Sequence, residues 1–90
     1  MADHEREVAL WPTQENYARF AALCDDNVPK TFEEFESAAS ARLAQMAAHG
    51  ITIQKLGFDP DRMAEWCRAQ FGKVDARARA AYAGFLALSD

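Results

Sequence analysis

Residues 31–50 carry the clearest structural signal in the chain, a helix whose start and end are both marked. Thr31 and Glu34 form a capping box, in which the hydroxyl and the carboxylate each accept a hydrogen bond from a backbone amide of the first turn. Gly50 supplies the left-handed conformation that ends many helices. Apolar residues recur between these signals at helical spacing, which predicts a long helix with one buried face: Phe32, Phe35, Ala39, Leu43 and Met46.

Three other segments show weaker helical signals. Thr13 is placed to cap a first helix, Asp59 opens a third that ends at Gly72, and Asp75 caps a fourth that ends near Leu88. The residues expected on one face of the first helix are Tyr17, Phe20, Ala21 and Cys24, those on the buried side of the third are Met63, Trp66, Cys67 and Phe71, and those on a broad apolar face of the fourth are Ala78, Ala81, Tyr82, Phe85 and Leu86.

The amino-acid composition favours helices over sheets. Of the 90 residues, 19 are Ala, whereas three are Val and two are Ile, so β-branched residues are scarce. Residues 51–54 alternate like a strand, but no second strand is evident, and we expect an extended linker between the second and third helices. The sequence predicts an all-α protein, a compact four-helix bundle forming one helical domain over residues 8–90, after a frayed N-terminal tail over residues 1–7.

The chain shows no secretion signal and no apolar run near the ~18 residues that a membrane span requires. Its two cysteines, Cys24 and Cys67, could form at most one disulfide and are interpreted as reduced thiols. We therefore expect a cytoplasmic protein with no membrane partner.

The charge argues against nucleic acid as a partner. The formal net charge is -4, and the residues from 37 onward carry only a small positive excess. A helix-turn-helix DNA-binding regulator formed by the third and fourth helices is the alternative prediction, with Arg77 and Arg79 on the presented helix. Against it, these two arginines lie two residues apart and point to nearly opposite sides, and Arg68 occupies a position where close helix packing favours Ala.

No pattern indicates catalysis, a cofactor or a metal ion. The possible metal ligands Cys24, Cys67, His4 and His49 are scattered without the spacing that places two ligands on one element. Paired acidic residues occur at helix starts, where they have a structural role. We expect no catalytic, cofactor-binding or metal-binding residues, although a site assembled only by the fold remains open.

The second and fourth helices have unusually smooth faces. From Ser37 to Ala48 the only charged residue is Arg42, and Gly84 costs about 1 kcal/mol inside a helix unless close approach requires it. Ala is also the best helix former, so the many small residues can reflect helix formation and not contact with a partner. We predict a small non-catalytic interaction or regulatory module whose partner is another protein or a second copy of the chain. The predicted partner-binding residues are Ser37, Ala41, Arg42, Ala44, Gln45, Ala48, Ala76, Ala80 and Gly84.

Overall fold

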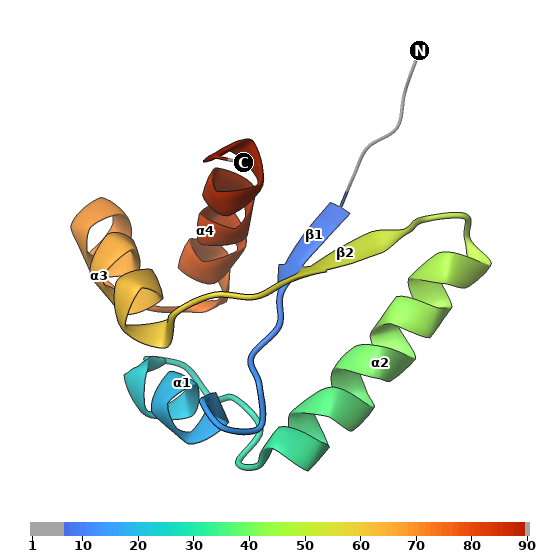
Figure 1. Cartoon of the computed structure of the whole chain (residues 1–90), viewed down its shortest axis with the longest axis horizontal. Helices are drawn as coiled ribbons and strands as arrows, with labels where there is room; N and C mark the ends of the chain where they lie inside the picture. Colours follow the sequence, from blue (N-terminus) through green and yellow to red (C-terminus); the bar gives the residue numbers. More distant parts are fainter. Residues whose placement is uncertain (1–6, 90) are drawn as a thin grey trace.

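The computed structural model describes residues 7–89. It contains four helices and two short strands (Figure 1). In chain order these are β1 (Glu7–Leu10), α1 (Tyr17–Leu23), α2 (Phe32–Ala48), β2 (Ile53–Leu56), α3 (Pro60–Phe71) and α4 (Ala76–Ser89). The four predicted helices are present. The predicted tail falls on residues 1–6, which lie outside the described residues, and on Glu7, which is the first residue of β1.

The helix caps explain why three of the helices begin where they do. The Thr31 hydroxyl accepts a hydrogen bond from the Glu34 amide at 3.1 Å, and the Asp59 carboxylate accepts from two amides at the start of α3. The Asp75 carboxylate accepts from the Ala78 amide at 2.9 Å at the start of α4. Gly72, at φ 79°, ends α3 in the left-handed region.

The first helix is shorter than predicted. Thr13 and Asn16 exchange hydrogen bonds between side chain and backbone, at 2.8 and 3.1 Å, and these bonds close a separate turn. The helix itself begins at Tyr17, so Thr13 caps the turn and not α1. The Tyr17 hydroxyl donates a hydrogen bond to the Pro29 carbonyl at 2.6 Å, which fastens α1 to the segment that leads into α2.

The prediction of an all-α protein is wrong, because β1 and β2 form a parallel two-stranded sheet. Glu7 pairs with Ile53 and Leu10 with Leu56, and the Trp11 amide extends the contact by donating to the Leu56 carbonyl at 2.8 Å. The segment predicted as a linker therefore has a partner, the strand Glu7–Leu10 that lies shortly before Pro12. Each strand is only four residues long, which is too short for a clear alternating pattern. The two strands of a parallel pair are also joined by a long crossover, here α1 and α2, so they lie far apart in the sequence.

The core lies between α1, α3 and α4, so the predicted four-helix bundle is also wrong in its packing. Helix α2 supplies no fully buried residue. Its Phe35 reaches the core from the side, with its ring 5.2 Å from Trp11 and 5.5 Å from Tyr17. The buried core cluster comprises Tyr17, Phe20, Met63, Ala64, Cys67, Val74, Ala78 and Tyr82. Within residues 7–89 there is no helix with the length and apolar character that crossing a membrane requires.

Candidate interaction surfaces

The predicted small-residue face of α2 lies in solvent. All six predicted partner-binding residues of this helix are exposed: Ser37, Ala41, Arg42, Ala44, Gln45 and Ala48. The opposite face of α2 is half-buried through its aromatic and aliphatic residues. The helix therefore contacts the rest of the protein on one side only, which leaves the small-residue face without a contact inside the described chain.

The predicted ridge on α4 is also outward-facing. Ala76 and Ala80 are exposed, and Gly84 is half-buried. A Cβ atom built on Gly84 would meet no neighbouring atom within 4 Å. Packing within the described chain therefore does not require glycine at this position, and the cost of a glycine inside a helix is not explained by a close intramolecular contact.

Helix α4 is apolar on all sides over its last turns. The nine residues 80–88 contain no charged side chain, and their one polar group is the hydroxyl of Tyr82. Tyr82 and Ala83 are buried, whereas Phe85 is 45% exposed and Leu88 is 89% exposed. A helix that is apolar all round is normally buried on all sides. We name the outward surface of this helix the α4 apolar face, formed by Ala76, Ala80, Gly84 and Leu88 at four-residue spacing, with Phe85 at its edge toward Trp66 of α3.

An aromatic cluster extends this surface onto α3. The half-buried Trp66 stacks on Phe85 with ring centroids 5.2 Å apart, and it lies 5.4 Å from Tyr82 and 6.1 Å from Phe71. Phe71 is 37% exposed. Phe71, predicted on the buried side of α3, is thus partly exposed, and Phe85, predicted on the apolar face of α4, is exposed over nearly half of its surface. The run of nine uncharged residues at 80–88 is the sequence signal that could have identified the exposed surface.

The structure separates the predicted residues into two surfaces. Figure 1 shows α2 and α4 well apart, with the two strands crossing the region between them. The two faces belong to different parts of the fold and differ in chemistry. The α4 apolar face carries large exposed apolar side chains, whereas the α2 face carries Ser and Ala with Arg42 and Gln45 at its edge.

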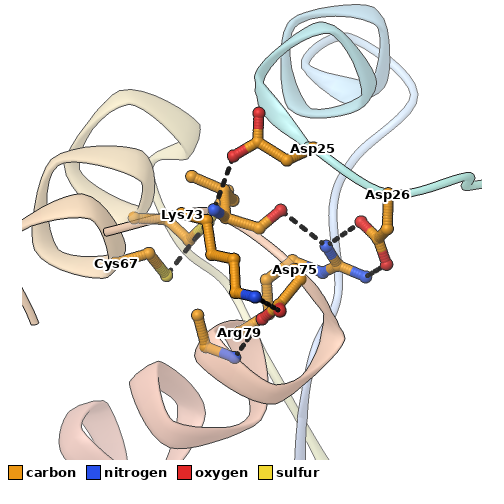
Figure 2. A network of polar contacts seen from close by, with 9 residues as sticks. Asp25, Asp26, Cys67, Lys73, Asp75 and Arg79 are labelled. Carbon is orange, nitrogen blue, oxygen red and sulfur yellow. Dashed lines mark hydrogen bonds and ion pairs between the residues drawn. The ribbon is translucent and has the colours of Figure 1, made fainter. Parts of the chain in front are cut away.

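A polar network fastens the segment after α1 to the start of α4 (Figure 2). The Arg79 guanidinium donates to both carboxylate oxygens of Asp26, at 2.7 and 3.1 Å, and only 15% of the Arg79 side chain is exposed. Hydrogen bonding from Arg79 holds the pKa of Asp26 below its usual value. The Asp25 carboxylate accepts a hydrogen bond from the Val74 amide at 2.7 Å.

This network weakens the helix-turn-helix alternative. Arg79 is bound to Asp26 and is mostly buried, so it is not presented to a DNA backbone. Arg77 is exposed, which leaves one of the two arginines that the alternative requires.

The two thiols lie in environments that suppress their reactivity. Cys67 is fully buried, and burial raises the pKa of its thiol. Cys24 is partly buried, and burial raises its pKa to about 11, so the nucleophilic thiolate is disfavoured near neutral pH. Among residues 7–89, no three His, Cys, Asp or Glu side chains are grouped so that they could hold a metal ion. His4 lies outside the described residues.

A shallow depression lies between α1 and α3. Arg19, Asp61, Arg62, Glu65 and Arg68 are among its lining residues. Arg19 donates to the Asp61 carboxylate through its Nε at 2.9 Å, and both side chains are 60% exposed. Charges of both signs lie together in an open setting, an arrangement typical of a solvated surface.

Comparisons with known proteins assign no family to the chain. No protein-family model matches it, and searches of curated proteins and of solved structures found no similar protein.

Proposed function

We propose that this protein is a non-catalytic interaction module of the cytoplasm that binds another protein chain through the α4 apolar face. The observation that carries the proposal is the uncharged run at residues 80–88, on a helix whose Phe85 and Leu88 are exposed. Contiguous exposed apolar side chains on a small protein mark sites of association. The suppressed reactivity of Cys24 and Cys67 supports a role that depends on contact and not on nucleophilic chemistry.

A capture experiment in lysate of the native host tests this proposal. The bait proteins are the wild type, Ala80→Glu on the α4 apolar face and Ala44→Glu on α2. Both alanines are exposed, so neither substitution removes a core contact. We expect Ala80→Glu to lose the captured protein, because a charge in the contact cannot be hydrated, and Ala44→Glu to retain it. Retention by Ala80→Glu with loss by Ala44→Glu, or capture of no protein by any bait, contradicts the proposal.

A duplex DNA column provides the second readout. With a formal net charge of -4, an interaction module is expected to pass through the column at physiological salt. It is not expected to show the steeply salt-dependent retention that is typical of DNA-binding proteins. Steeply salt-dependent retention that is lost in Arg77→Gln contradicts the proposal in favour of a DNA-binding regulator.

A further inference from the structure

We propose that the partner of the α4 apolar face is the same face of a second copy, with the two α4 helices packed antiparallel about a two-fold axis. This inference rests on the proposed function, and it adds the identity of the partner and the geometry of the contact. A two-fold contact uses one surface patch twice, so each group on the patch must meet its complement on the same patch. The sizes and charges along α4 meet this requirement.

The side chains along the face are complementary in size when the helices run in opposite directions. A two-fold axis centred between Ala80 and Gly84 places each Ala80 opposite the partner's Gly84. It also places each Ala76 opposite the partner's Leu88, the most exposed large apolar side chain in the described chain. Leu88 thus projects over a small residue. Gly84, where an added Cβ would have no neighbour within 4 Å, lets the two backbones approach closely at the centre.

The charges on the helix favour the same antiparallel direction. Arg77 lies in the first turn of α4, where the helix dipole is positive, and it is exposed. The last turn of the helix, where the dipole is negative, holds no basic residue. Antiparallel packing moves Arg77 of each copy next to the carbonyl end of the partner helix, where a cation is stabilised. Parallel packing would instead bring the two Arg77 guanidinium groups together.

The aromatic cluster beside the helix adds apolar area to this contact. Phe85 lies at the edge of the face and is stacked on Trp66, so it reaches the contact already held in one position. A pair of helices of 14 residues forms an interface at the small end of the specific range. We therefore expect a reversible dimer that forms within about 1 to 500 µM, and not a permanent one.

Sedimentation of the purified 90-residue chain, from about 1 to 500 µM, measures the dimer directly. The wild type is expected to shift from monomer to dimer across this range. Gly84→Leu fills the central gap and is expected to weaken the dimer at least tenfold, by about the 1.4 kcal/mol or more that this factor requires. The same change removes a glycine from a helix interior, so the thermal midpoint of the monomer is expected to rise or stay the same. Ala44→Leu, on the exposed face of α2, is the matched control and leaves dimerisation unchanged.

Arg77→Gln tests the direction of packing. Antiparallel packing predicts a dimer about three- to thirty-fold weaker at low salt, because two contacts between a cation and a helix end are lost. A tighter dimer in Arg77→Gln overturns the antiparallel arrangement, because removal of like-charge repulsion is the expected result for parallel helices.

Two results overturn the second copy as the partner: a wild type that stays monomeric to about 500 µM, or a dimer that Gly84→Leu does not weaken. These experiments use purified protein alone, whereas the lysate capture tests the proposed function. A monomeric wild type that captures a foreign protein through Ala80 therefore refutes this inference and leaves the proposed function standing.

Discussion

Arg79 shows how much one side chain can contribute to the stability of a small protein. It comes from α4, and it holds Asp26 of the segment after α1 through two hydrogen bonds in a mostly buried position. Hydrogen bonds to charged groups contribute more than neutral ones, and removal of one partner leaves the other partly desolvated and unpaired. The Arg19–Asp61 pair has similar chemistry but is largely in solvent.

We predict that Asp26→Asn lowers the free energy of unfolding by about 2 kcal/mol at pH 7. The native pKa of Asp26 is below its usual value, so the stabilisation is complete above the unfolded-state pKa and is lost as the pH falls through the native pKa. Urea unfolding of wild type and variant at pH 7 and near pH 3 measures the difference, which shrinks in acid. Asp61→Asn is the control and changes stability by less than about 0.5 kcal/mol. Equal effects of the two substitutions would contradict the prediction that the Arg79–Asp26 pair stabilises the fold more than the exposed Arg19–Asp61 pair.

The thiols provide a second prediction at this scale. In the folded protein at pH 7.5, iodoacetamide is expected to modify Cys24 at least about tenfold more slowly than in the urea-unfolded chain, because burial raises its pKa to about 11. Cys67, with a fully buried side chain, is expected to be slower still. Modification of each site is followed by mass spectrometry. Rapid folded-state labelling of Cys24 at neutral pH would show that a thiolate is stabilised there.

At the scale of elements, local signals were predictable and distant pairings were not. Thr31 and Asp59 mark helix starts because the groups they bind lie within three residues, so the sequence alone contains both partners. The pairing of Glu7 with Ile53 joins segments far apart in sequence, and neither four-residue strand has a pattern that identifies the other. Periodicity identified the apolar sides of α3 and α4, but it could not show that Phe71 and Phe85 would remain partly exposed.

Leu10 tests whether β1 is an integral element or a loosely held arm. It is partly buried and packs against the core cluster, so Leu10→Ala is expected to cost about 2 kcal/mol in the free energy of unfolding. Glu7→Ala, in the same strand but exposed, is expected to change it by less than about 0.5 kcal/mol. Urea titration followed by circular dichroism measures both. A negligible effect of Leu10→Ala would mean that the sheet contributes little to the fold.

At the scale of the whole molecule, the number of buried side chains limits stability. A chain of 90 residues buries a smaller share of its surface than a larger domain, and here α2 contributes no fully buried residue. The aromatic rings of Phe71 and Phe85 remain partly in solvent for the same reason. Association through α4 would therefore add burial to a small core.

Because dimer formation stabilises only the folded chain, the thermal midpoint of the wild type is expected to rise with protein concentration. Scanning calorimetry over a hundredfold concentration range, on the order of 5 to 500 µM, in which the dimer is expected to form, measures this rise. The midpoint of Gly84→Leu is expected to vary far less across the same range. A wild-type midpoint that is independent of concentration argues against a coupling between folding and association.

The parallel sheet also has a consequence for synthesis of the protein on the ribosome. β1 is translated before its partner, because the strand that completes its hydrogen bonds begins only at Ile53, and the core residues of α3 and α4 follow later still. At about 5–20 residues per second, the nascent N-terminal segment waits for seconds before a native pairing becomes available. Acquisition of the native structure is therefore delayed until α4 has been translated, and during this interval the apolar residues of β1 are open to chaperones.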